Sequence, residues 1–343
     1  MASDEFEIIR RHFNRSGLAF AVPEVPLAIG DDCALLALRP GTQLAVSMDM
    51  LQEGVHFLPD SDPFLLGQRT LLVNLSDLAA MGARPVCFTL ALSLPRHDVA
   101  WLSQFSAGLA AVAAAHHCPL VGGDLTASAA DSAGRPGALT LCVQVHGEVP
   151  AGSGLRRSGA QVGDGIYVTG TLGNAAAGLR VLRDGAWPAL DPVLRGTLVR
   201  AFHVPESRVE AGLALRDVAT AAIDLSDGLA SDLVHVLTAS GVAARIDLDT
   251  LPLSAALCAA AGFDERTQLA LGGGDDYELC FTVPSEREIS MRARMADLRT
   301  PVCRVGEVLA GSGVQWWRGG AQQTLSVKGY NHFAHKDQEQ NLD

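Results

Sequence analysis

NLSDLAAMGARPVCFTLALSLP, residues 74–95, places the end of an apolar helix directly before a strong strand. The helix is expected to begin at Asp62-Pro63, because an Asp cap followed by proline is typical of a first helical turn, and to end near Gly82. The same alternation of strand and helix recurs on both sides of this stretch. It predicts an α/β (α+β) fold in two domains, which 343 residues can supply at about 150 residues per domain.

The expected elements of the first half are a short amphipathic helix at 4–16, strands at 28–38, 42–50, 84–95, 119–124 and 138–149, and a long Ala-rich helix at 97–117. In the second half we expect strands at 165–170, 221–228, 244–250, 277–284 and within 301–330, and helices at 172–185, 205–218, 229–241, 254–262 and near 286–300. A glycine-rich stretch near 150–165 is the best candidate linker. The expected domains are therefore 1–150 and 151–333, and we expect the polar tail 334–343 to be disordered.

Composition excludes several classes of function. The net charge is −12 and no basic run is present, which argues against a nucleic-acid or anionic-membrane partner. Lysine occurs only at Lys328 and Lys336, and no GxxxxGK[ST] motif exists, so this is not a P-loop protein. The seven cysteines lack zinc spacing and fit buried, reduced thiols. Without an apolar signal core or an 18-residue apolar span, we expect a cytoplasmic protein.

Aspartates recur where apolar runs or glycine pairs end, and two interpretations of them are open. Carboxylates on rigid supports suit hard cations such as Mg²⁺. Scattered over the surface, they would be ordinary caps and turn residues. Two unpaired carboxylates about 4 Å apart repel by roughly 4 kcal/mol at an effective dielectric near 20, so convergence would require metal. The aspartates in question are Asp31, Asp32, Asp49, Asp77, Asp124, Asp224, Asp227, Asp275 and Asp276.

Two corners in the second half each admit two interpretations. GTLGNAAAG, residues 170–178, places glycines at a helix start, where they could approach a phosphate or simply form the turn. Asp224, Ser226 and Asp227 lie where a strand enters a helix. Two carboxylates and a hydroxyl so close together make a good metal–phosphate corner, but Asp227 could equally cap the helix.

Three features of the first half and the linker are similarly open. Asp77 lies one turn after Asn74 on the same helix face, so it is either buried and paired or functional. Arg157 in the linker could reach a phosphate or could be a solvated loop charge, and the same applies to its neighbour Arg156. His56, in QEGVHF, is a lone histidine, and such a residue is more often structural than a ligand.

Taken in order, these motifs resemble the thiamine-phosphate kinase family, within the ATP-binding superfamily of aminoimidazole-ribonucleotide synthetase. The resemblance runs from about residue 5 to residue 333, and its most specific parts are NLSDLAAMGA, IDLSDG and the terminal KGYNHF. The motifs are IGDDCALL (29–36), SMDM (47–50), GVHFLPD (54–60), NLSDLAAMGARP (74–85), LVGGD (120–124), RSGA (157–160), GDGIYVTGTLG (163–173), IDLSDGLASDL (223–233), GGDDYELCFTVP (273–284) and KGYNHF (328–333).

The resemblance implies the last step of thiamine diphosphate biosynthesis: ATP and thiamine monophosphate give ADP and thiamine diphosphate by direct in-line transfer. It implies several Mg²⁺ ions, ATP as co-substrate, and a homodimer. The N-terminal domain would bind ATP and Mg²⁺ and dimerise through its sheet, and a C-terminal α/β domain would close over the site. No general base is expected, because the nucleophile is an ionised phosphate oxygen.

The resemblance also implies residue roles. The expected metal ligands are Asp31, Asp32, Ser47, Met48 (through its carbonyl), Asp49, Asp77, Asp124, Asp224 and Asp227. The expected ATP contacts are Gly123, Asp124, Arg157 and Ser226, and the expected substrate contacts are His56, Asp275 and Tyr330. Two positions depart from the family pattern. The family often has a pattern like STDT where SMDM stands here, and Asp275 stands where it has Glu, which leaves the substrate contact of Asp275 the least certain assignment.

Three alternative hypotheses about the function remain. The first is a sister enzyme of the same superfamily, such as selenophosphate synthetase or aminoimidazole-ribonucleotide synthetase. Selenophosphate synthetase would carry a reactive Cys and Lys near the N-terminus, and residues 1–30 contain neither. A non-catalytic nucleotide-sensing protein would be expected to have lost several of these carboxylates, and here all remain. The third reading, an acidic structural α/β protein, does not account for the ordered motif set.

Overall fold

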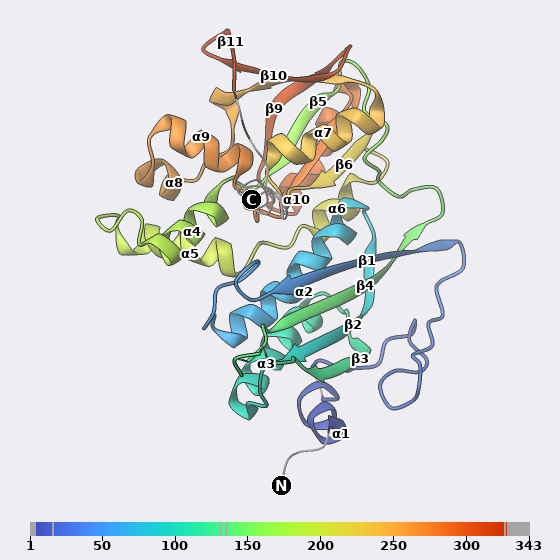
Figure 1. Cartoon of the computed structure of the whole chain (residues 1–343). Helices are drawn as coiled ribbons and strands as arrows, with labels where there is room; N and C mark the ends of the chain where they lie inside the picture. Colours follow the sequence, from blue (N-terminus) through green and yellow to red (C-terminus); the bar gives the residue numbers. More distant parts are fainter. Residues whose placement is uncertain (1–4, 16, 131, 135, 326, 328–343) are drawn as a thin grey trace, which may run out of the picture. The chain divides into compact units, whose positions relative to one another are not determined.

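The computed structural model describes residues 5–15, 17–130, 132–134, 136–325 and 327 (Figure 1). The chain forms two compact units, Met1–Leu155 with His203–Val218, and Arg156–Phe202 with Ala219–Asp343. The return of 203–218 to the first unit is absent from the sequence-based division at residue 150. It depends on helix α6 (Val209–Leu215), which packs on helix α2 (Pro63–Ala80). A Cβ at Gly212 would stand 2.0 Å from the Ala79 carbonyl oxygen, so only glycine permits this approach.

The first unit is built on a four-stranded sheet in the order β1-β4-β2-β3 (Figure 1). Only the β2–β3 pair is parallel. Alternate residues of β4, such as Val143 and Val145, are fully buried, and α2 contacts both β1 and β4. The strands are β1 (Thr42–Gln52), β2 (Arg84–Leu94), β3 (Leu120–Ala127) and β4 (Thr140–Pro150), and the remaining helices are α1 (Glu5–Ile8), a π-helix (Ile9–Phe13) and α3 (Val99–Ala115).

The predicted strand at 28–38 is wrong. This part of the chain forms only isolated bridges, one of which joins Leu27 to Leu35, and it turns back on itself at Gly30. Its small apolar side chains pack on a cluster that includes Val86 and Val121, so their alternation reflects packing on a sheet instead of membership in one. We call residues 24–39 the aspartate loop, because it carries Asp31 and Asp32.

The second unit is built on a seven-stranded sheet in the order β11-β10-β7-β9-β5-β8-β6. Strands β5, β8 and β6 are buried along their whole length. The strands are β5 (Gly165–Thr169), β6 (Ala221–Asp224), β7 (Ala243–Asp247), β8 (Leu279–Val283), β9 (Val302–Leu309), β10 (Gly313–Arg318) and β11 (Ala321–Gln323); the α-helices are α4 (Asn174–Asp184), α5 (Pro192–His203), α7 (Leu229–Ser240), α8 (Ala255–Ala260), α9 (Phe263–Gly272) and α10 (Glu288–Asp297).

Helices α5 and α9 were not among the expected elements. Helix α5 begins at an Asp-Pro pair, and the Asp191 carboxylate accepts a hydrogen bond from the Val193 N–H at 2.9 Å. The predicted tail at 334–343 lies outside the described residues. Within the described part of the chain, no helix is long and apolar enough to cross a membrane.

Candidate functional site

A cavity of about 610 Å³ in the first unit brings together four of the expected ligands. The aspartate loop contributes Asp31 and Asp32, and β3 contributes Gly123 and Asp124. All three aspartates are exposed, and the Asp31 carboxylate accepts a hydrogen bond from the Asp32 N–H at 2.9 Å. Arg10 also lines the cavity, which supplies a cation beside the carboxylates.

Gly123 has a packing role beside its expected phosphate contact. A Cβ at this position would lie 1.8 Å from the carbonyl oxygen of Leu90, on the neighbouring strand β2. Any larger residue would push β3 away from β2. The Gly-Gly-Asp corner therefore fixes where Asp124 leaves the sheet, whatever Gly123 binds.

A second group of expected ligands lies between β1 and α2. The Ser47 hydroxyl donates to the Asp77 carboxylate at 2.5 Å, and the Asp49 N–H donates to the Asn74 side-chain oxygen at 3.0 Å. Asn74 is itself buried and donates to the Thr70 carbonyl at 2.9 Å. The strand and the helix thus hold Ser47, Asp49 and Asp77 together on one face.

Met48 belongs to the other face of β1. Its side chain is 59% exposed, because successive residues of a strand point to opposite faces of the sheet. Only its backbone carbonyl could contribute to a site on the α2 side, which is the role that the family resemblance implies for it.

The two groups lie at opposite edges of the sheet. The register places Asp49, Val143, Leu90 and Gly123 in one row across β1, β4, β2 and β3. Three strand spacings separate the ends of this row, which is roughly 14 Å. Asp49 and Asp124 of one copy therefore cannot bind a single ion. Across the described residues, no three His, Cys, Asp or Glu side chains are grouped closely enough to hold a metal ion.

A third group forms in the second unit, where β6 ends at Asp224. The Asp275 N–H donates to the Ser226 carbonyl at 2.8 Å, so an expected substrate contact lies beside an expected ATP contact. Asp275 adopts φ 64° and Tyr277 φ 51°, both in the left-handed region that non-glycine residues avoid. A strained backbone of this kind is often found at ligand sites.

Asp227 does not cap α7 with its side chain. The N-cap residue of the helix is Gly228, and the Asp227 N–H donates to the Asp232 carboxylate at 3.0 Å. Asp232 is 3% exposed, and burial raises its pKa to about 7, with the charges of Asp227 and Asp224 adding to the effect. The capping role considered for Asp227 is therefore not observed, and Asp232 of the first helical turn, which sequence reasoning passed over, holds the Asp227 backbone instead.

The glycine turn before α4 is closed by a protein carboxylate. The Gly173 N–H donates to Asp276 at 2.8 Å, in the position where a phosphate at a helix start would bind. Asp276 is buried, and desolvation raises its pKa well above the usual value. Of the two interpretations of GTLGNAAAG, the structure favours the simple turn.

His56 lies in a tightly hydrogen-bonded turn after β1. Its Nδ1 accepts a hydrogen bond from the Gln52 N–H at 3.1 Å, which places the proton of the neutral ring on Nε2. The guanidinium of Arg69, 1% exposed inside α2, stands 3.5 Å from the His56 carbonyl oxygen. An arginine within the apolar run of α2 was the available signal for this support, and sequence reasoning missed it.

The linker arginines are both exposed, and the structure does not separate them. The Arg156 carbonyl accepts from the Ala222 N–H at 2.8 Å, and the Arg157 carbonyl accepts from the Ser240 hydroxyl at 3.3 Å. Both contacts use the backbone and leave the choice of the inward-facing side chain open. Tyr330, the remaining expected substrate contact, lies outside the described residues.

Comparison with known proteins gives consistent matches over most of the chain. Residues 30–149 match the N-terminal domain of the AIR synthase related proteins, and residues 161–316 match the C-terminal domain. Thiamine-monophosphate kinase of Salmonella typhimurium is 44% identical over 97% of this chain and 99% of the relative. Among solved structures, thiamine-monophosphate kinase from Stenotrophomonas maltophilia is 43% identical, with a TM-score of 0.79 over 88% of this chain and 93% of that one.

A further solved structure contains ligands. It is described as AaThiL complexed with AMPPCP and TMP, and it is 30% identical, with a TM-score of 0.74 over 87% of this chain and 89% of that one. These matches confirm both the resemblance drawn from the ordered motifs and the predicted two-domain α/β class.

Proposed function

Because the chain belongs to the thiamine-monophosphate kinase family of the AIR synthase related proteins, we propose that it transfers the terminal phosphate of ATP to thiamine monophosphate. The products are ADP and thiamine diphosphate. The observation that carries the proposal is the identity of 44% over nearly the full length of a thiamine-monophosphate kinase. The relative that was solved with AMPPCP and TMP supports the choice of both substrates.

The oxygen donors of the first unit fit Mg²⁺. Carboxylates, a hydroxyl and a backbone carbonyl are the hard ligands that this ion prefers. Asp31, Asp32 and Asp124 would hold Mg²⁺ at the cavity; Ser47, the Met48 carbonyl, Asp49 and Asp77 would hold it beside α2; Asp224 and Asp227 would hold it in the second unit. When bound, the metal neutralises charge that develops on the transferred phosphate.

The remaining roles follow from the same chemistry. The acceptor phosphate is already ionised, so the protein needs to position it and does not need to remove a proton. The Nε2–H of His56 is a suitable donor to an oxygen of the substrate, and Asp275 and Tyr330 would complete that contact. Gly123, Asp124, Arg157 and Ser226 would bind ATP, with Arg157 providing a cation for a phosphate.

We also propose that the protein forms a homodimer through the sheet of the first unit. Leu44, Val46, Met48 and Met50 form an exposed apolar row on the outer strand β1, with exposed fractions between 44% and 59%. Such a row on an edge strand invites association unless it is covered. A second copy would cover it, because a two-fold arrangement can place β1 beside β3 of the partner at both edges and close the two sheets into one barrel.

This arrangement also accounts for the separation of the two carboxylate groups. Asp49 and Gly123 share a row, so pairing β1 with β3 of the partner places the group around Asp49 one strand spacing, about 4.8 Å, from the partner's β3. The group around Asp124 of the partner would then complete the site. Each dimer would contain two such shared sites.

The function is tested by ADP release from the purified protein with ATP and Mg²⁺. Thiamine monophosphate is the test acceptor, and thiamine, which lacks the phosphate nucleophile, is the control. We expect turnover with the monophosphate alone and thiamine diphosphate as the product on chromatography. A protein that binds ATP but turns over neither acceptor would contradict the proposal.

A further inference from the structure

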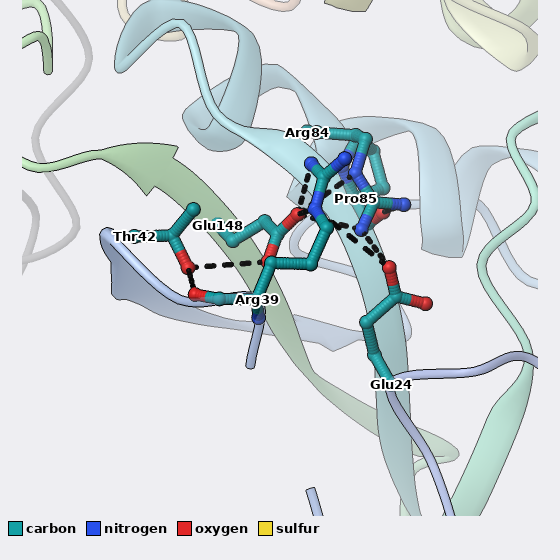
Figure 2. A network of polar contacts seen from close by, with 6 residues as sticks. All are labelled: Glu24, Arg39, Thr42, Arg84, Pro85 and Glu148. Carbon is teal, nitrogen blue, oxygen red and sulfur yellow. Dashed lines mark hydrogen bonds and ion pairs between the residues drawn. The ribbon is translucent and has the colours of Figure 1, made fainter. Parts of the chain in front are cut away.

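A network of two glutamates and two arginines lies at one end of the first unit's sheet (Figure 2). Glu148 of β4 is 1% exposed and accepts hydrogen bonds from Arg84 of β2, at 2.7 Å from Nη2 and 3.1 Å from Nε, and from Arg39. Arg84 Nη2 also stands 2.5 Å from a carboxylate oxygen of Glu24. Burial by itself would raise the pKa of Glu148, but the hydrogen bonds from the arginines lower it overall, so the carboxylate is held ionised.

The network joins the two ends of the aspartate loop. Glu24 begins the loop and pairs with Arg84 of β2, and Arg39 ends the loop and pairs with Glu148 of β4. The Ala37 N–H also donates to the Glu24 carbonyl at 2.8 Å, so side chains and backbone close the loop at one place. Asp31 and Asp32 lie at the far end, where the loop lines the cavity.

We propose that the Glu24–Arg84–Glu148–Arg39 network is a positioning device for Mg²⁺ at the cavity. It fixes the base of the aspartate loop to β2 and β4, and β2 in turn carries β3 with Asp124. The distance between the loop carboxylates and Asp124 is thereby tied to one rigid sheet. Removing a group that orients metal ligands typically weakens metal binding about ten- to a hundredfold. The inference rests on the proposed assignment of Asp31, Asp32 and Asp124 to Mg²⁺.

The test uses Arg84→Gln, which removes both ion pairs of Arg84 in one substitution. Mn²⁺, which accepts the same carboxylate ligands as Mg²⁺, is titrated into the full-length protein and followed by EPR of the free ion. We expect the Kd to rise about tenfold, as for other residues that orient metal ligands, with kcat at saturating Mg²⁺ almost unchanged. Arg183→Gln is the matched control, because it breaks the exposed pair Arg183–Asp184 of the second unit. This control is expected to keep the wild-type Kd.

Two results separate this inference from the function on which it rests. Wild-type Mn²⁺ affinity in Arg84→Gln, whatever happens to the Tm, would show that the network is only structural. Asp124→Asn is measured in parallel. Wild-type Mn²⁺ affinity in that variant would instead show that Asp124 does not bind the metal at the cavity. If Arg84→Gln does not fold, Glu24→Gln releases one end of the loop and the same comparison of Kd values decides.

Discussion

Mixing two inactive variants tests whether the carboxylate groups of different copies form one site. Asp49→Asn removes a charge from the β1 group, and Asp124→Asn removes one from the cavity group, with almost no change in side-chain size. One unit charge at about 4 Å is worth roughly 4 kcal/mol at an effective dielectric near 20. That corresponds to about a thousandfold in rate, so each variant alone is expected to be nearly inactive.

The expected recovery follows from the geometry of the sheet. Within one copy the two groups stand roughly 14 Å apart, so neither variant can repair itself. In a mixed dimer, one shared site carries both substitutions and the other carries none. Random exchange makes about half of the dimers mixed, and each has one of two sites intact, so about a quarter of the wild-type rate is expected.

The assay is ADP release after the two variants are mixed in equal amounts and allowed to exchange subunits. Each variant incubated alone is the control for slow recovery. A second mixture, Asp49→Asn with Asp77→Asn, supplies the matched comparison, because both residues belong to the β1 group and no intact site can form. No recovery in the first mixture, with exchange shown by a tagged subunit, would refute the shared site.

Three further predictions concern single residues. Arg157→Ala is expected to weaken transition-state stabilisation with ATP, measured through kcat/KM, by about 1.5–3 kcal/mol, the value of a hydrogen bond to a charged group. Unchanged ATP kinetics would favour Arg156 instead. Gly212→Ala is expected to lower the free energy of unfolding, measured by thermal unfolding, by about 1–3 kcal/mol, because its Cβ would overlap the Ala79 carbonyl. Gly196→Ala is the control, because a Cβ at Gly196 would meet no other atom. Burial, with Arg11 adding, lowers the pKa of His12 below 6.5, so the folded state favours the neutral ring, and its stabilisation is present above pH 6.5 and lost as the pH falls. His12→Gln should therefore flatten the pH dependence of the Tm below pH 6.5, and a curve parallel to that of the wild type would contradict this.

Local chemistry was a good guide to single elements. The Asp62-Pro63 pair placed the start of α2 correctly, because the Asp62 carboxylate accepts from the Leu65 N–H and proline needs no partner at the first turn. The same signal stands at Asp191-Pro192 and marks the start of α5, which sequence reasoning did not use. The prediction of a strand at 28–38 was wrong because an alternation of apolar and polar residues indicates which side chains are buried, and does not indicate which element buries them.

The arrangement of the candidate site depends on information that no local pattern contains. Sequence order places Asp49 and Asp124 in strands with one other strand, β2, between them. In the sheet, β4 also lies between β1 and β2, although it comes last of the four strands in the chain, and it adds a third strand spacing between the two carboxylates. Spacing and motif order could therefore identify the aspartates but could not show that they form separate groups.

The separation gives the acidic composition a physical meaning. Carboxylates gathered at one point in an isolated copy would repel one another before any metal arrived. Divided between two edges, each group needs only local partners, such as the Ser47 hydroxyl for Asp77 and the Asp32 N–H for Asp31. The full charge would then meet only in the assembled dimer, where Mg²⁺ and ATP can bind as the site forms. On this view dimer formation and metal binding are linked, and Mg²⁺ with ATP should shift the protein toward the dimer in analytical ultracentrifugation, an effect that Asp49→Asn should weaken.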